Sequence, residues 1–232
     1  MVLTIFYLIK FLESPYMQIQ ALGKLLVAIV TVSQLSACGV IAVSGVTATA
    51  TVLADRRSPG VQAIDKGIEL QASGSFDKTF GDNAHINVTS FNQKVLLTGE
   101  VKDASIKAEA EKYAKGMKNV RSVFNELIIG PNSTYTMRAE DAYLESKIKT
   151  QMIFTQQLPS NSMTIVAEGS SVYLMGILTQ SEADIAKKIA SNTNGVKDVY
   201  AYFDIISDAE KTRLEKAGKA DESQPESPPK FQ

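Results

Sequence analysis

The fold is decided by the stretch Val95-Leu96-Leu97-Thr98-Gly99-Glu100-Val101, because it recurs about 77 residues later as Val172-Tyr173-Leu174-Met175-Gly176-Ile177-Leu178. In each copy a shorter alternating segment precedes it, Ile86-Asn87-Val88 or Met163-Thr164-Ile165. A Val-x-x-Val segment follows it in both copies. Alternation of apolar and polar residues around a short turn predicts a β-hairpin. Three blocks that recur in the same order predict two copies of one structural unit.

Helical patterns lie on both sides of each hairpin. Apolar residues recur at helical spacing after the hairpin, at Ile106, Ala110, Tyr113 and Met117 in the first copy and at Ile185, Ala186, Ile189 and Ala190 in the second. A helix also precedes each hairpin, marked by Ile64, Ile68 and Leu70 in the first copy and by Leu144, Ile148 and Met152 in the second. Each unit is therefore expected to have the order α-β-β-α-β.

Four glycines have predicted roles in this unit. Gly99 and Gly176 occupy equivalent places in the second strand, where a missing side chain permits a bulge or close packing of the following helix. Gly116 and Gly195 fall near helix ends, where we expect left-handed caps.

The sequence predicts an α+β protein with two tandem domains. Each is expected to be an αββαβ unit whose small three-stranded mixed sheet packs on two helices. The first domain is expected over residues 58–130 and the second over 138–207, joined by a turn-rich linker over 131–137. Residues 208–232 are expected to form a disordered tail, since the chain becomes rich in Lys, Glu, Ser and Pro from about Ala217.

The only cysteine, Cys38, closes the run Leu35-Ser36-Ala37-Cys38 after an apolar stretch. This layout resembles a bacterial lipoprotein signal. Residues 1–37 would then be removed, and residues 38–57 would form a tether acylated at Cys38. Met17 is an alternative start of the chain, because a signal that begins there has an ordinary length. A buried free cysteine is the other interpretation of Cys38.

The residue after the cysteine bears on the location of the protein. Gly39 stands where an Asp would be the usual signal for retention in the inner membrane. We therefore expect a lipid-anchored protein on the periplasmic face of the outer membrane.

Composition argues against several classes of function. The formal net charge is −1. This argues against nucleic acid as a partner, because binding to nucleic acid needs clustered positive charge. His85 is the only histidine, so neither a Ser-His-Asp triad nor a multi-histidine metal site can be assembled, and we expect a structural or surface residue. Asp65 and Glu69, like Glu109 and Glu111, lie in helical patterns near lysines and are expected to be solvated. We expect no catalysis, no cofactor and no metal.

The Val-x-Leu-x-Gly hairpin and the Gly-x-Val-x-x-Val third strand resemble the BON domain, present here twice. Tandem copies behind a lipoprotein signal resemble the dual BON-domain outer-membrane lipoproteins, and the resemblance covers nearly the whole mature chain. It is closest at Asp55-Arg56-Arg57-Ser58, Ile86-Asn87-Val88-Thr89, Lys94-Val95-Leu96-Leu97 and Val172-Tyr173-Leu174-Met175-Gly176. It implies a protein that is not an enzyme, binds anionic phospholipid such as phosphatidylglycerol, concentrates at the division site and supports outer-membrane integrity.

The resemblance also implies where lipid would bind. The lipid-facing element is the first helix of the second domain, here about Ala139 to Phe154, and its expected contacts are Tyr143, Leu144, Lys147 and Lys149. Tyr143 stands where the family has a tryptophan, and its ring suits the headgroup region. The residues alone leave other interpretations open. Leu144 follows a core stripe, Tyr143 suits a partly exposed packing position, and the two lysines suit a solvated face.

A second function remains open from the sequence. The protein would then be a periplasmic adaptor whose domains contact envelope proteins, such as the outer-membrane protein assembly machinery, through sheet edges or helix surfaces. A dependence on anionic lipid separates the two hypotheses. A hydrolase is disfavoured because the catalytic groups are missing.

Overall fold

The computed structural model describes residues 55–222, which lie in one compact unit of the chain. The predicted signal, the predicted acylation site Cys38 and most of the predicted tether lie outside the described residues. Domain 1 consists of α3 (Pro59–Phe80), η2 (Gly81–Asn83), β1 (Ala84–Phe91), β2 (Lys94–Val101), α4 (Ala104–Gly116), β3 (Ser122–Asn125) and β4 (Ile128–Ile129). Domain 2 consists of α5 (Tyr135–Ile153), η3 (Ser160–Ser162), β5 (Met163–Glu168), β6 (Ser171–Leu178), α6 (Gln180–Asn192) and β7 (Asp198–Ile205), and α7 (Asp208–Glu222) follows it.

The two sheets have the same topology, which confirms the predicted α+β fold. In domain 1 the central strand β2 pairs antiparallel with β1 and parallel with β3 and β4. In domain 2 the central strand β6 pairs antiparallel with β5 and parallel with β7. The predicted third strand of domain 1 is divided into β3 and β4, whereas β7 is continuous.

The helices begin at residues that their sequences make favourable. Ser58 accepts a hydrogen bond from the backbone amide of Val61, and Pro59 follows it in the first turn of α3. Thr134 caps α5 in the same way. The linker is therefore shorter than expected, because α5 begins at Tyr135 within the range 131–137. In α6, Thr179 and Glu182 form a reciprocal capping box.

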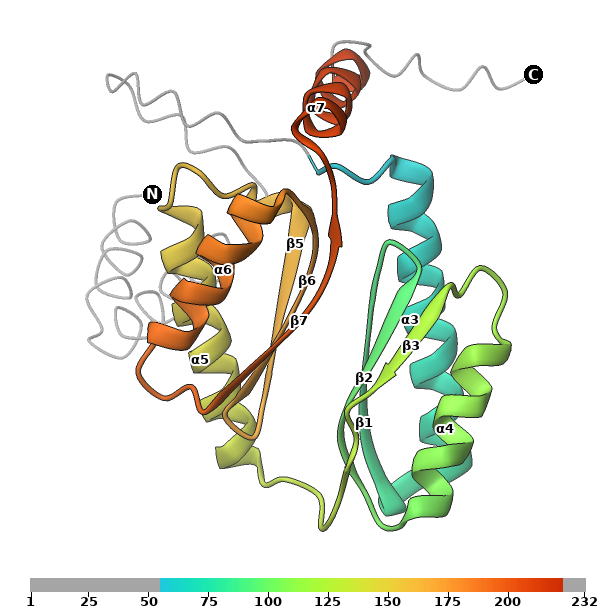
Figure 1. The fold of residues 1–232 in the computed structure, drawn as a ribbon. Helices are drawn as coiled ribbons and strands as arrows, with labels where there is room; N and C mark the ends of the chain where they lie inside the picture. The colour runs from blue at the N-terminus through green and yellow to red at the C-terminus, as the bar shows by residue number, and fades with distance from the viewer. Residues whose placement is uncertain (1–54, 223–232) are drawn as a thin grey trace, which may run out of the picture. The chain divides into compact units, whose positions relative to one another are not determined.

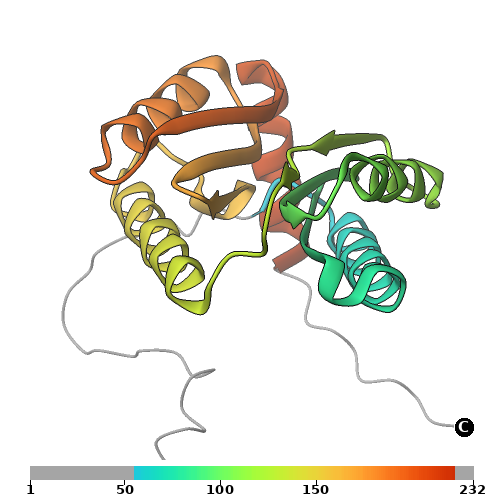
Figure 2. The ribbon, with the colours of Figure 1, turned by 90° about the horizontal axis from the view of Figure 1, so that it is seen from below.

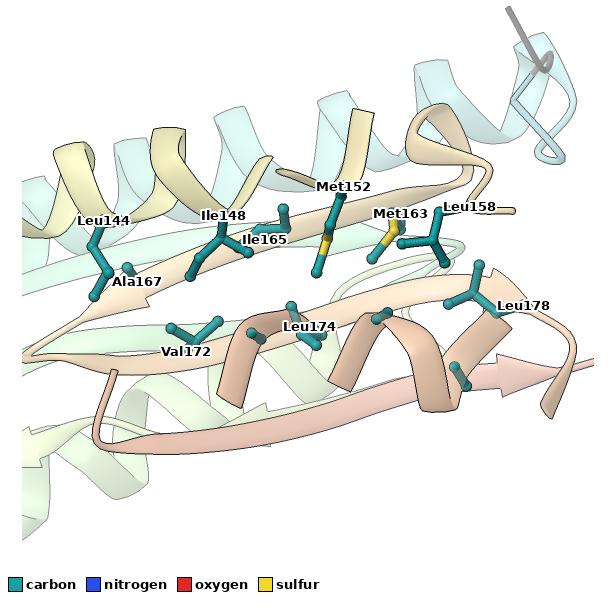
Figure 3. Close-up of a cluster of buried hydrophobic side chains, with 13 residues drawn as sticks. Leu144, Ile148, Met152, Leu158, Met163, Ile165, Ala167, Val172, Leu174 and Leu178 are labelled. Carbon is teal, nitrogen blue, oxygen red and sulfur yellow. The ribbon is translucent and has the colours of Figure 1, made fainter. Parts of the chain in front are cut away.

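Each domain has its own core between its sheet and its two helices. Figures 1 and 2 show α5 and α6 on one face of the β5–β6–β7 sheet, and α3 and α4 on one face of the other sheet. In domain 2, Leu144, Ile148 and Met152 of α5 point toward the strands (Figure 3). Ile148 and the sheet residues Val172 and Leu174 are fully buried. Burial of each such side chain stabilises the fold by about 1.5–3 kcal/mol.

A third cluster covers the other faces of the two sheets. It unites Phe91 and Leu96 of domain 1 with Tyr173, Met175 and Ile177 of domain 2. The rings of Phe124 and Tyr202 stack across it, with centroids 4.0 Å apart. Both faces of β2 and β6 are thus covered, which explains why every residue of these strands after the first is buried.

Gly99 and Gly176 allow a neighbouring strand to approach, rather than the following helix. A Cβ on Gly99 would lie 2.0 Å from the backbone oxygen of His85, and the φ angle of Gly99 is 107°. A Cβ on Gly176 would lie 2.9 Å from Cβ of Met163. Gly176 is opposite Met163, the first paired residue of β5, and Gly99 is opposite Ile86, near the start of β1.

The expected left-handed caps are absent, because the helices α4 and α6 end in extended residues, Met117 and Thr193. Gly195 has a φ angle of 106°, but it lies two residues beyond the cap of α6. Gly116 is instead the last residue of α4, and the left-handed conformation falls on Asn119, with φ 69°. Asparagine tolerates this region better than most residues, which lets it replace glycine here.

The prediction of disorder from residue 208 is wrong for residues 208–222, which form α7. Its N-terminus is capped by Ser207, whose hydroxyl accepts from the amide of Glu210. Leu214 packs on the cluster between the sheets, and Lys211 and Glu215 form ion pairs with Glu182 and Arg56. Tertiary contacts therefore stabilise a segment whose composition alone is typical of disorder.

Candidate functional site

The helix α5 is fixed to its own sheet by two carboxylates. Asp141 accepts hydrogen bonds from the backbone amides of Gly169 and Ser170, at 3.0 and 3.1 Å, in the turn between β5 and β6. One turn later along the helix, Glu145 accepts from the amide of Ala167, and burial raises the pKa of Glu145. These contacts fix which face of α5 is turned away from the sheet.

The same arrangement occurs in domain 1, where the prediction of solvated acidic residues is wrong for Asp65 and Glu69. Asp65 is 2% exposed and accepts from the amides of Asn92 and Gln93, at 2.8 and 2.7 Å. Glu69 accepts from the amide of Ser90 at 3.0 Å. Asn92 and Gln93 both have positive φ, so their amides converge on the carboxylate of Asp65. Among the other two acidic residues, Glu109 is exposed, and Glu111 pairs with Lys115 and Asn125.

The four residues expected to bind lipid do not share one face of α5. Tyr143 is 71% exposed, and Lys149 is exposed beside the same face. Lys147 is half-buried and donates to the backbone oxygen of Asn194 at 3.0 Å. Leu144 is 7% exposed and belongs to the core of domain 2. A direct lipid contact by Leu144 is therefore inconsistent with this geometry, because its side chain already packs on the sheet.

The outward face of α5 carries apolar residues that sequence reasoning missed. Tyr135 at its start, and Ile153 and Phe154 at its end, are 87%, 54% and 82% exposed. Tyr143 and Phe154 are eleven residues apart, about three helical turns, so they lie near one another in angle around the helix. On α3, the equivalent helix of domain 1, the exposed large apolar residue is Leu70. The exposed apolar surface is thus concentrated on the first helix of domain 2.

Two neighbouring arginines before α3 connect the start of the described chain to different domains. Arg56 is 5% exposed and donates to Glu182 through two bonds of 2.7 and 2.9 Å, and it also donates to Glu215 and to the backbone oxygen of Ile177. Burial alone would raise the pKa of Glu182, but hydrogen bonds from Arg56 and Lys211 lower it to about 2.

Arg57, by contrast, contacts domain 1. It donates to Asp65 at 2.9 Å and lies 3.9 Å over the ring of Phe91. The pair Arg56-Arg57 therefore joins the two domains at one point of the chain.

Polar contacts also cross between the domains. Lys94 and Asn92 of domain 1 bind Asp204 of β7, at 2.7 and 2.9 Å. The hydroxyl of Tyr202 donates to Glu126 at 2.6 Å; burial and this carboxylate raise the pKa of Tyr202. These bonds add polar contacts between the two domains to those of the apolar cluster.

His85 is a half-buried residue of β1, the strand that pairs antiparallel with β2. Its Nδ1 lies 3.3 Å from Oε2 of Glu100, the residue directly opposite in the ladder. The same carboxylate oxygen accepts from the amide of Ser133 at 3.0 Å.

No helix in residues 55–222 combines the length and the apolar character that a membrane-spanning segment requires.

Comparison with known proteins places the chain in a family. The sequence model of the BON domain matches it twice, at residues 65–131 and 140–206. The chain is 30% identical over 189 residues to "Outer membrane lipoprotein DolP" of Haemophilus influenzae, which covers 81% of this chain and 98% of that protein. It is 29% identical to the "21 kDa hemolysin" of Actinobacillus pleuropneumoniae, over 66% of this chain and 79% of that protein. It is 30% identical to "Osmotically-inducible protein Y" of Escherichia coli K12, over 49% of this chain and 58% of that protein.

None of the names of these three relatives states an enzymatic reaction. The two matched ranges coincide with the two structural repeats, and the first relative is aligned along almost its whole length. The chain therefore belongs to the BON-domain family, as a dual BON-domain protein of the DolP outer-membrane lipoprotein group.

Proposed function

We propose that this protein is anchored by acyl chains on Cys38 to the periplasmic face of the outer membrane and binds anionic phospholipid through the outward face of α5. It has no catalytic role in this proposal, and its binding supports the integrity of the outer membrane, including at the division site. The single observation that carries the proposal is the exposed apolar face of α5, formed by Tyr143, Ile153 and Phe154 beside Lys149.

The chemistry of this face suits a membrane interface. The ring of Tyr143 can lie at the headgroup level, while Ile153 and Phe154 at the helix end reach the acyl boundary. Burial of their exposed parts would contribute about 1–2 kcal/mol each, and Lys149 near an anionic surface about 1 kcal/mol. The sum, about 4–7 kcal/mol, corresponds to a Kd between roughly 10 µM and 1 mM, which is a weak contact on its own.

The acyl anchor would make this weak contact effective. A lipid-anchored protein meets the same membrane at an effective concentration in the millimolar range, so a submillimolar contact is largely occupied. The segment from Gly39 to Ala54 can span at most roughly 55 Å, which keeps the domains within reach of the surface. The anchor would supply permanence, and α5 would supply the dependence on lipid composition.

Vesicle co-sedimentation of the unacylated chain from Asp55 to Gln232 tests the proposal. Binding should require phosphatidylglycerol and be lost on zwitterionic vesicles. Tyr143→Ala and Phe154→Ser should each weaken it by roughly 5- to 30-fold, which corresponds to 1–2 kcal/mol. Leu70→Ala is the matched control, because Leu70 is 65% exposed on the equivalent helix of domain 1. Equal binding to both vesicle types, or equal losses in all three variants, would contradict the proposal.

An adaptor role is the second candidate, and one surface supports it. Ile128 and Ile129 of the short strand β4 are 48% and 54% exposed at the edge of the first sheet. An exposed apolar edge can pair with a strand of an envelope protein, such as a component of the outer-membrane protein assembly machinery. Absence of binding to either vesicle type would favour this role.

A further inference from the structure

Three metal-ligating side chains from three strands converge between the two domains. His85 of β1 and Glu100 of β2 are opposite one another in the ladder, so their side chains share one face of the sheet. Glu168, the last residue of β5, reaches the same place from domain 2. One ligand atom from each of the three lies within 4.8 Å of the others.

The charge at this place is not balanced in the way it is elsewhere in the protein. Asp65, Glu168 and Glu182 are the acidic residues of the described chain that are 3% exposed or less. Asp65 forms an ion pair with Arg57, and Glu182 forms ion pairs with Arg56 and Lys211.

Glu168 has no ion pair with a lysine or arginine among the described residues, and it faces the carboxylate of Glu100. Buried carboxylates normally require a counter-charge. The charge of Arg138 acts on Glu168, but its guanidinium donates hydrogen bonds to the hydroxyl and backbone oxygen of Ser133 and forms no ion pair with Glu168. A cation between Glu100, Glu168 and His85 would supply the missing charge.

The ligand types indicate which cation fits. One imidazole nitrogen and two carboxylate oxygens form a donor set for zinc and neighbouring divalent transition metals, whereas calcium and magnesium prefer oxygen alone. The 3.3 Å between Nδ1 of His85 and Oε2 of Glu100 is the separation expected of two ligands on a tetrahedral ion with bonds of about 2.0–2.1 Å. Glu168 would complete three protein ligands with a small movement of its side chain.

Neighbouring groups hold the carboxylates in orientation. The amide of Asn87 donates to Oε2 of Glu168 at 2.8 Å, and the backbone amide of Ser133 donates to Oε2 of Glu100 at 3.0 Å. Such outer contacts are typical of metal sites, where they fix the direction of each ligand.

We propose that His85, Glu100 and Glu168 form a binding site for one divalent transition-metal ion of the zinc class, and that the bound ion ties the first BON domain to the second. The proposal does not depend on lipid binding. It departs from the expectation of no metal drawn from the sequence, which considered multi-histidine sites, because two of the three ligands here are carboxylates from distant strands.

The test is zinc titration of the full chain in detergent, purified without a polyhistidine tag. All samples carry Cys38→Ser, because a free thiol would bind zinc. One equivalent of zinc should bind, and zinc at a hundredfold excess over its Kd should raise the Tm by roughly 5–10 °C. His85→Asn and Glu168→Gln should abolish this shift. Asp184→Asn, which changes an exposed carboxylate, should leave it unchanged.

A spectroscopic measurement on the unaltered site keeps the proposal falsifiable if a variant fails to fold. Because His85 is the only histidine, its ring ¹⁵N resonances report directly on metal binding. Zinc should shift the Nδ1 resonance, and calcium at the same concentration should not. A thermal shift that persists in His85→Asn and Glu168→Gln, or ring resonances that zinc leaves unchanged, would overturn the proposal.

Discussion

Removal of the Arg56 guanidinium should destabilise the whole two-domain unit. Arg56 and Glu182 are almost fully buried and are joined by two hydrogen bonds of 2.7 and 2.9 Å. Loss of one partner from a buried ion pair costs about 3–5 kcal/mol, because the other charge is left without compensation. For a unit of this size, Arg56→Met should lower the Tm by roughly 6–20 °C and the free energy of unfolding in urea accordingly. Arg213→Ala, at an exposed ion pair on α7, is the control and should leave the Tm and the free energy of unfolding almost unchanged.

The dependence on pH gives an independent check. The pKa of Glu182 is about 2 in the folded protein, against an ordinary value of 4.5. A carboxylate with a lowered folded pKa contributes stability above its unfolded pKa, and this contribution is lost as pH falls. The wild type should therefore lose roughly 3 kcal/mol from this group between about pH 4.5 and 2. In Arg56→Met the pKa of Glu182 moves up toward or past its unfolded value, so this loss of stability on acidification should become smaller or disappear.

A double-mutant cycle separates the pair from its surroundings. Glu182→Gln retains the capping box of α6 but removes the charge that Arg56 meets. If the two side chains act as a pair, the double variant should be more stable than the sum of the single losses predicts, by about 0.5–3 kcal/mol. A loss below about 1 kcal/mol in Arg56→Met, or additive losses in the cycle, would refute the argument.

Two further outcomes can be checked by urea unfolding. Asp65→Ala should destabilise the protein by roughly 2–4 kcal/mol, because it leaves two turn amides and a serine hydroxyl without an acceptor. Asp141→Ala should destabilise it by less, because Asp141 accepts only from two turn amides. Equal losses would contradict this ranking. Gly99→Ala should cost more than about 3 kcal/mol or prevent folding, because its Cβ would lie 2.0 Å from the backbone oxygen of His85, whereas Gly67→Ala in the open interior of α3 should stabilise by about 0.5–1 kcal/mol.

The architecture was readable from the sequence because hydrophobic periodicity and the internal repeat report on local structure. The hairpin, the two helices and the third strand each have a characteristic spacing of apolar residues. Because the unit occurs twice, each assignment in one copy can be checked against the other. Asp65 was misread because its helical neighbours suggest solvation, while its partners are turn amides 27 and 28 residues away. Asp141 stands at the equivalent position of the second copy. An acidic residue at the same place in both copies indicates a shared structural role, which the helical pattern alone does not reveal.

The candidate sites were less readable for a related reason. Tyr143 was identified through a family resemblance, but the apolar end of the same face at Ile153 and Phe154 is defined by which residues the sheet leaves uncovered. The cluster of His85, Glu100 and Glu168 joins strands of two domains, and no local pattern in the chain brings these residues together. Contacts of this kind depend on tertiary structure alone.

The bonds of Arg56 determine which domain would first receive tension applied at the N-terminal segment. That domain is the second one along the chain. The chain reaches domain 1 first, yet Arg56 is bonded to η3, β6, α6 and α7, all of which belong to domain 2 or follow it. A pull on the N-terminal segment from a membrane anchor would therefore pass into domain 2 before it reached α3. Domain 2, which carries the exposed face of α5, would therefore be connected to the anchor by a shorter length of chain than domain 1 is.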